Sequence, residues 1–205
     1  MTGGREPFLK WPGWNHLKFA ALLTVLGTIW FIIVYAGCDT ITAHRATRVR
    51  IHFDWELRIP LIPPMTIFYM SIYALFLAAP FIIRERKDFG RLCLKLNVAI
   101  LIAGIFFLLI PAQLAFPPAE NLGLWTSLFN FADRLNLHYN LAPSLHVALS
   151  VSCIATFSKR ASPSVGTVLW LWAIAISLST VLTHQHHVID VLAGWALAWA
   201  LCTRI

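Results

Sequence analysis

Long apolar runs separated by short polar segments dominate this chain and predict its architecture. A helix that crosses the hydrocarbon core of a bilayer needs about 20 predominantly apolar residues, and six runs approach that length. We therefore predict an all-α fold, a polytopic membrane helix bundle with six transmembrane helices. The expected spans cover residues 17–37, 63–83, 96–115, 142–158, 164–183 and 187–203.

The composition agrees with a membrane protein. Of the 205 residues, 59% are hydrophobic and 12% are charged, whereas soluble domains are about half apolar and about a quarter charged. We expect residues 1–205 to form one membrane-embedded domain. The net charge of +7 comes from short basic runs beside the apolar segments, so it indicates membrane topology and no nucleic-acid partner. The four cysteines lack metal-ligand or redox spacing, and we expect free thiols.

The first apolar run follows a basic N-terminus and therefore resembles a signal peptide. It ends in Tyr35-Ala36-Gly37-Cys38, which is similar to a lipoprotein cleavage box. Such a box usually has an aliphatic residue where Tyr35 stands, and the run is long enough to span a membrane. We expect an uncleaved first span.

Lysine and arginine residues divide unequally between the two sides of the predicted bundle. Eleven of the sixteen fall at the two termini and in alternate loops, and such basic loops stay in the cytoplasm. We therefore predict a multi-pass protein of the cell membrane with both termini in the cytoplasm. The opposite, periplasmic or extracytoplasmic face carries the other five, which are Arg45, Arg48, Arg50, Arg58 and Arg134.

The connection between the first two spans, residues 39–62, allows two interpretations. Arg45 and Arg48 have helical spacing beside apolar residues, which favours an amphipathic helix on the outer leaflet with arginines facing an anionic head group. The alternative is a solvated connection without a binding role.

Two short motifs at the ends of apolar runs carry the candidate chemistry, and the topology places both on the extracytoplasmic face. In the second motif, His186 and Asp190 are four residues apart and share one face of a helix. A carboxylate bonded to one imidazole nitrogen fixes the tautomer and leaves the other nitrogen free to attack. In the first motif, His146 opens a different helix and can protonate a leaving oxygen. Ser144 lies near the start of that helix, where backbone N–H groups favour a phosphate.

A metal site is the competing interpretation, because His184, His186, His187 and Asp190 are all potential zinc or iron ligands. However, His184 and His186 are two residues apart and point to different sides of a helix. Membrane di-iron enzymes also need several histidine clusters, and this chain has one. We expect no metal.

Pro143-Ser144-Leu145-His146, followed about forty residues later by His-x-x-x-Asp at the start of a span, resembles the type 2 phosphatidic acid phosphatase superfamily. The resemblance covers roughly residues 50–200. It implies six helices and a reaction that needs no metal or other cofactor. It also implies that His186 is a nucleophile that forms a phosphohistidine, that Asp190 orients it, and that His146 is the general acid.

The chain departs from the family pattern in three places. Leu145 replaces a glycine, Thr180 replaces an arginine, and Phe116-Pro117-Pro118 stands where a motif with lysine and arginine is expected. The run from Asn140 to Ala148, with the upstream Ile59–Pro63, is closer to one branch. That branch contains the inositol phosphorylceramide synthases and related phosphatases, which also carry Pro-Ser-Leu-His and lack the arginine.

A phosphoryl oxyanion in a dry site needs a cation or other strong donors. We expect an arginine of the extracytoplasmic face to replace the missing phosphate-binding arginine. Arg134 is the first candidate, and Arg58, Arg45 and Arg48 are the alternatives. We predict that Ser144, Asn140, Arg134 and Arg58 bind the substrate phosphate.

The predicted function is a membrane lipid phosphatase that hydrolyses a lipid phosphate or diphosphate at the non-cytoplasmic face. A lipid phosphotransferase similar to inositol phosphorylceramide synthase is the alternative, because an alcohol can replace water in the second step. A non-enzymatic transporter with histidine proton relays is a further alternative, although broken helices and internal symmetry are not visible. The hydropathy argues against a soluble vanadate-binding haloperoxidase. The sequence defines neither the lipid nor the oligomeric state.

Overall fold

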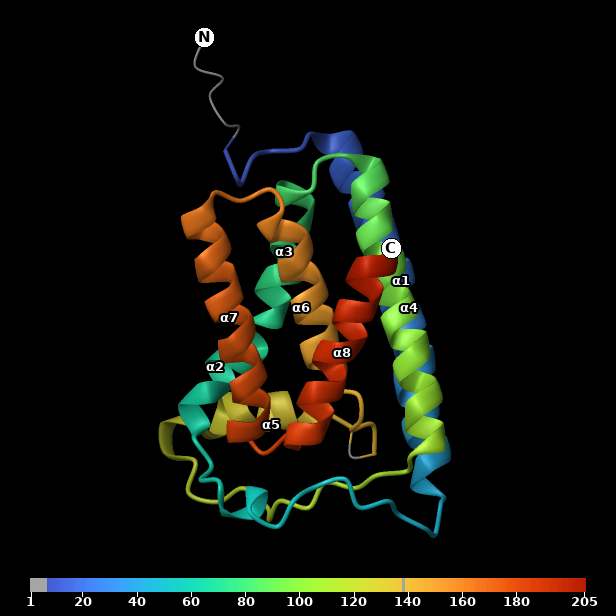
Figure 1. Ribbon diagram of the computed structural model, residues 1–205, viewed down its shortest axis with the longest axis vertical. Coiled ribbons are helices and arrows are strands. Elements are labelled where there is room, and N and C mark those ends of the chain that lie inside the picture. Colours follow the sequence, from blue (N-terminus) through green and yellow to red (C-terminus); the bar gives the residue numbers. More distant parts are fainter. Residues whose placement is uncertain (1–6, 138) are drawn as a thin grey trace.

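The computed structural model describes residues 7–137 and 139–205, and within these residues it is built from helices and loops without a β-strand (Figure 1). The helices are α1 (Trp14–Ala43), α2 (Thr66–Met70), α3 (Ile72–Ile82), α4 (Arg86–Leu109), α5 (Thr126–Leu135), α6 (Leu145–Ser158), α7 (Pro163–Leu182) and α8 (Val188–Arg204). Single 3-10 turns occur at Glu56–Arg58, Pro63–Met65 and Gly123–Trp125. The predicted all-α class is confirmed.

The long helices run side by side, and the loops gather at the two ends of the bundle (Figure 1). One end carries the described segments 44–65, 110–137, 139–144 and 183–187, together with the first turns of α6 and α8, and so holds both histidine motifs; we call it the histidine end. The opposite end carries residue 7 and the α3–α4 and α6–α7 turns. The two motifs therefore lie at the same end of the bundle, as the sequence predicts.

Four helical segments are long and apolar enough to cross a membrane, and they are Trp14–Ala43, Pro63–Ile82, Arg86–Leu109 and Pro163–Leu182. The other two predicted spans form shorter helices, with 14 residues in α6 and 17 in α8. At 1.5 Å per residue, α6 extends for about 21 Å, less than the roughly 30 Å of a bilayer core. Its shortness fits its position, because α3, α4, α7 and α8 pack around it.

The third predicted span is displaced along the chain. It was expected at residues 96–115, but α4 begins at Arg86 and ends at Leu109. The first turns of α4 contain basic residues, so the apolar run that predicts the span begins later than the helix itself. Residues 110–115 instead belong to a loop at the histidine end, where the backbone N–H of Val49 donates to the Pro111 carbonyl oxygen over 2.9 Å.

Of the two interpretations of the connection between the first two spans, the structure contradicts the amphipathic helix. Helix α1 continues to Ala43, and the rest of the connection is a loop interrupted by the turn Glu56–Arg58. Near Val49 the backbone forms an isolated parallel bridge to Ala112. This pairing uses backbone groups that a helix would need, so tertiary contacts override the helical spacing of the arginines.

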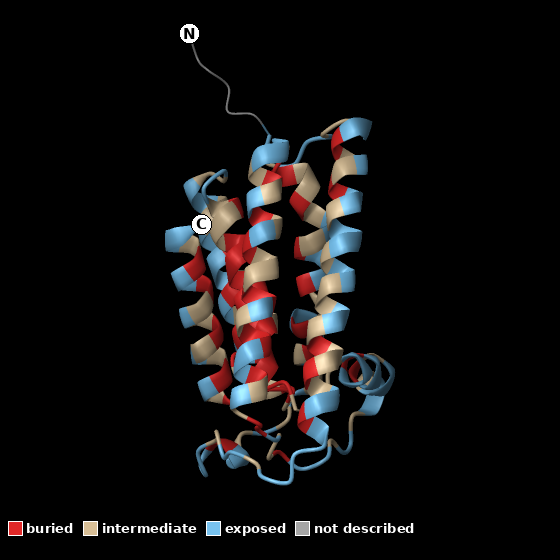
Figure 2. Ribbon diagram, turned by 90° about the vertical axis from the view of Figure 1, so that its right-hand side faces the viewer, coloured by how far each residue is buried: buried red, intermediate tan, exposed pale blue. Residues whose placement is uncertain are grey.

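Helix α5 was not predicted. It lies across the histidine end rather than along the bundle (Figure 1), and it is seen nearly end-on in the turned view of Figure 2. Phe129 and Ala132 are three residues apart and form its buried side. Its ten residues are too short and too polar to appear in a search for membrane spans, which explains the omission.

The core of the bundle brings the two motifs together, and its buried positions face inward between the helices (Figure 2). Gly194 of α8 lies against the start of α6, where an added Cβ would come within 2.7 Å of the Ser144 carbonyl oxygen and 3.0 Å of Val147 Cβ. The backbone oxygen of Asp190, the third residue of α8, accepts the Ser144 N–H at 2.9 Å. The glycine therefore permits the close approach that joins the motifs.

Replacement of Gly194 by alanine tests this close approach. The methyl group meets backbone rather than a flexible side chain, so we expect G194A to cost about 1–3 kcal/mol and to lower both the unfolding midpoint and the activity. Thermal unfolding in detergent measures the first. G37A is the control, because nothing lies within 4 Å of the added Cβ in α1. Equal unfolding midpoints for G194A and the wild type would contradict this packing.

Candidate active site

The segment that carries the second motif is shaped by the end of α7. His184 has a positive φ of 57°, and the N–H groups of His184 and Gln185 donate to the carbonyl oxygens of Val181 and Thr180. This pair of bonds is a Schellman motif, which usually places glycine at the left-handed position. The Thr180 carbonyl also accepts the N–H of His186 at 3.0 Å. The helix end thus fixes the backbone of His186.

His186 and Asp190 meet, but not on one face of a helix as predicted. His186 lies before α8, whose N-cap is His187, and Asp190 occupies the third helical position. His186 Nδ1 is 3.4 Å from Asp190 Oδ2, and the same oxygen accepts the His187 N–H at 2.8 Å. The second bond is one half of a capping box. The pair therefore results from helix capping rather than from helical spacing.

The tautomer of His186 follows from its partner. A carboxylate only accepts, so Nδ1 carries the hydrogen and Nε2 presents a lone pair. Both side chains are buried, with 3% of His186 and none of Asp190 exposed. This tautomer leaves Nε2 as the nitrogen that can attack an electrophile.

His146 lies in the first turn of α6, and its ring is fixed by Tyr69. Its Nε2 donates to the Tyr69 carbonyl oxygen at 2.5 Å, and the two rings stack with centroids 3.9 Å apart. Because a carbonyl oxygen cannot donate, Nδ1 is the nitrogen left for proton transfer. Two residues before His146, the Ser144 N–H donates to the Asp190 backbone oxygen at 2.9 Å, so the start of α6 lies against the residue that holds His186.

A break between α2 and α3 makes the Tyr69 carbonyl available. Ser71 separates the two helices, and the local bonds there span three residues, from Ser71 N to the Phe68 oxygen and from Ala74 N to the Ser71 oxygen. Trp172 of α7 donates its Nε1–H to Ser71 Oγ at 2.7 Å. Residues outside both motifs therefore orient His146.

Ser144 and Asn140 lie on the approach to α6. Ser144 is the N-cap, its Oγ accepts the Val147 N–H at 3.4 Å, and it is fully buried. Asn140 donates its Nδ2–H to the Tyr35 carbonyl oxygen at 2.6 Å, while its buried Oδ1 has no partner among the described residues. The geometry shows a structural role for each, and their phosphate-binding roles stay predictions.

Arg134 and Arg58 are exposed at the histidine end, and neither side chain is paired with another residue of the described chain. Gln185 lies next to His186 and holds the end of α5, since its amide donates to Asp133 Oδ1 at 3.1 Å and accepts from Asn136 at 2.5 Å. The end of α5, which carries the exposed Arg134, is thereby held near Gln185.

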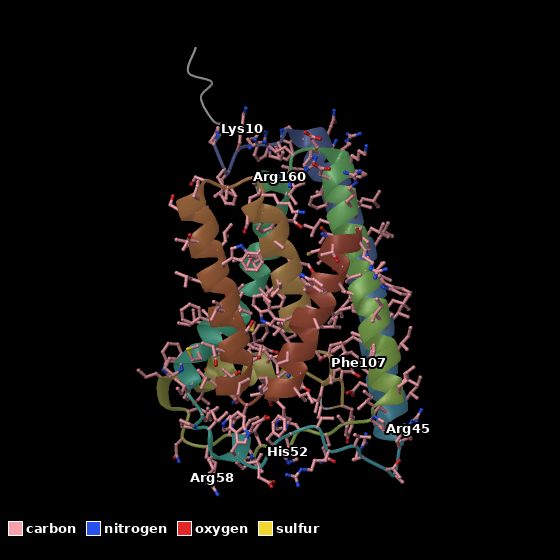
Figure 3. All side chains as sticks on the ribbon, viewed as in Figure 1. Lys10, Arg45, His52, Arg58, Phe107 and Arg160 are labelled. Carbon is pink, nitrogen blue, oxygen red and sulfur yellow. The ribbon has the colours of Figure 1, made fainter. Side chains whose placement is uncertain are left out.

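The other predicted arginines lie less favourably. In Figure 3, Arg58 points outward from the histidine end, and Arg45 lies at the side of the bundle near the end of α1. Arg48 stacks over the Tyr139 ring at 4.0 Å, and its buried Nη1 has no hydrogen-bond partner within the described residues. Position 180 supplies no cation, because threonine is uncharged. The Thr180 hydroxyl is buried and donates to the Ser177 carbonyl oxygen of its own helix.

Two loop residues to which the sequence analysis gave no role in the site contact the second motif. Phe116 lies between two rings of the second motif, with centroids 4.1 Å from His184 and 4.7 Å from His187. Glu56 is fully buried and contacts His187. In the sequence, the one indication that Glu56 is buried is its position between the apolar residues Trp55 and Leu57. Within residues 7–137 and 139–205, no three histidine, cysteine, aspartate or glutamate side chains are grouped as metal ligands.

The sequence profile of the PAP2 superfamily matches residues 47–203, which is most of the chain. The protein therefore belongs to the PAP2 superfamily, whose members are generally phosphatases and phosphotransferases, and the predicted family is confirmed. No curated protein and no solved structure matches the chain. Family membership supports an enzyme, and the four apolar spans indicate a membrane protein.

We expect the packing of residues 110–118 against His184 and His187 to weaken at low pH. Burial lowers the pKa of both His184 and His187 below the ordinary value of 6.5. Local unfolding that exposes the two rings therefore lets them bind more protons, so the contribution of this packing to stability is complete above about pH 6.5 and decreases as the pH falls.

We expect faster amide hydrogen exchange in residues 110–118 at pH 5 than at pH 7.5, after correction for the intrinsic effect of pH. Mass spectrometry of peptides measures this, with a peptide from the buried part of α6 as the internal reference. Equal corrected protection at the two values would contradict the titration of these histidines.

Proposed function

We propose that the protein is a membrane lipid phosphatase that works through a phosphohistidine on His186. The observation that carries this proposal is that each of the two histidines is held by a hydrogen bond at a different ring nitrogen. Asp190 holds Nδ1 of His186, and the Tyr69 carbonyl holds Nε2 of His146. One ring thus offers a nucleophilic nitrogen and the other offers a nitrogen for proton transfer, which are the two groups that the reaction needs.

In the first step, Nε2 of His186 attacks phosphorus, and the bond from phosphorus to the leaving oxygen breaks. His146 in its protonated form gives the Nδ1 proton to that oxygen, so the product leaves as the neutral lipid alcohol or as the singly protonated lipid phosphate. The phosphorylated imidazole is cationic while Nδ1 keeps its hydrogen, and the Asp190 carboxylate stabilises it. In the second step, water attacks phosphorus, His146 Nδ1 accepts its proton, and the P–N bond breaks to release phosphate.

The membrane arrangement of this proposal follows the charge pattern. Arg86, Lys159 and Arg160 lie at the end opposite the histidines, and basic loops stay in the cytoplasm. We place both termini in the cytoplasm of a cell-membrane protein, with the active site on the extracytoplasmic face. Helices α6 and α8 act as two short spans among the four longer ones, so the single domain crosses the membrane six times.

Phosphotransfer is the second candidate function, and the buried Thr180 favours it. The arginine usual in the family is replaced, as in the branch that contains inositol phosphorylceramide synthases. The first step is unchanged, and an alcohol replaces water as the second acceptor. Thin-layer analysis of products formed with and without an alcohol acceptor distinguishes the two reactions.

Removal of either histidine tests the proposed function. We expect H186A to lower the rate of phosphate release from lipid phosphates by more than about 1,000-fold, and H146A to lower it by about 100-fold to 10,000-fold. H44A is the matched control, because His44 is an exposed histidine at the end of α1. Release at the wild-type rate by either site variant would rule out this mechanism.

Arg134 is the proposed phosphate cation, and its loss tests the binding part of the proposal. We expect R134A to raise KM for the lipid phosphate and to weaken inhibition by vanadate, each by about tenfold, because a charge-assisted bond contributes about 1.5–3 kcal/mol. R50A is the control, since Arg50 is exposed at the same end and paired with Asp54. An unchanged vanadate inhibition constant would transfer the role to another arginine.

A further inference from the structure

A second histidine–carboxylate pair is buried beside the first, and neither motif contains its acid. His187 Nδ1 lies 3.0 Å from Glu56 Oε2, and both side chains are fully buried. The Ala115 N–H donates to His187 Nε2 at 3.2 Å, so that nitrogen is an acceptor. Nδ1 therefore carries the hydrogen and donates to Glu56. Both nitrogens of His187 are used, which leaves none for attack on a substrate.

Glu56 accepts three hydrogen bonds, and all of them come from fixed donors. Besides His187 Nδ1, the Val188 N–H donates to Oε2 at 3.1 Å and the Phe53 N–H donates to Oε1 at 3.3 Å. An unpaired buried carboxylate is costly, whereas donors and the positive end of a helix stabilise it. The residues on either side, Trp55 and Leu57, are exposed. The loop thus inserts one acid under the N-terminus of α8.

The Glu56 contacts lead to the nucleophile through one peptide group. His187 binds Glu56 with its ring and binds Asp190 Oδ2 with its backbone N–H. The same Oδ2 holds His186, while the buried Oδ1 of Asp190 has no partner in the described part of the chain. The direction of the Asp190 carboxylate, and with it the His186 ring, therefore depends on where His187 is held.

We propose that Glu56 is a positioning residue for the phosphoryl-transfer step, which orients the Asp190–His186 pair by holding His187 and the first N–H of α8. The inference rests on the proposed phosphatase function. Glu56 is fully buried, so it makes no contact with the lipid and acts on the rate rather than on substrate binding. A displacement of about 1 Å at a reacting group costs about 100-fold in rate.

The test uses the purified full-length protein in lipid vesicles, with a lipid phosphate that the wild type hydrolyses. We expect E56Q to lower kcat by about 10-fold to 100-fold while KM changes by less than about twofold. E56D keeps the charge but is too short to reach both His187 and Val188, so it loses kcat in the same way. D54N is the matched control, because Asp54 is an exposed acid of the same loop, and its kcat is expected to be normal.

A double-mutant cycle separates positioning from a general structural role. If Glu56 acts through Asp190, the E56Q effect on kcat shrinks to less than about twofold in a D190N background. An E56Q effect of undiminished size in D190N, a normal kcat in folded E56Q and E56D, or failure of both variants to fold would each overturn the inference. If the wild type hydrolyses no lipid phosphate, the proposed function itself fails.

Discussion

The rest of the site depends on the hydrogen bonds that the Asp190 carboxylate accepts. Its Oδ2 accepts the N–H of the α8 N-cap and the Nδ1–H of His186, so one oxygen both caps a helix and orients the proposed nucleophile. The Asp190 backbone oxygen also holds the Ser144 N–H at the start of α6. Gly194, one turn further along α8, allows this approach. The contacts that pack α8 against α6 therefore also set the geometry of the proposed active site.

Both of the histidines that we propose as catalytic depend on groups outside the two motifs for their orientation. The Tyr69 carbonyl, left available by the break at Ser71, fixes His146, and the acid of a distant loop holds the residue after His186. These partners lie in segments that meet only at the histidine end of the bundle. The loops there supply buried donors and acceptors, which explains why a polar site persists at the end of an apolar bundle.

The sequence predicts much of this architecture, and its failures have physical causes. Apolar runs located the helices, and motif spacing correctly paired His186 with Asp190, although capping rather than a shared helix face brings them together. Helix α5 was missed because it is short and polar. The amphipathic helix near Arg48 was wrong because Val49 pairs with the loop after α4. Glu56 was missed because its partner is 131 residues away in sequence, and no local pattern reports such a contact.

Trapping the phosphorylated intermediate tests the central claim most directly. Protein mixed with a labelled lipid phosphate is quenched in alkali, digested and analysed by mass spectrometry, and the phosphorylated nitrogen is identified by phosphorus NMR. The account predicts an acid-labile phosphate on His186, attached at Nε2, because Asp190 occupies Nδ1. Phosphate on another residue, or on Nδ1 of His186, would contradict it.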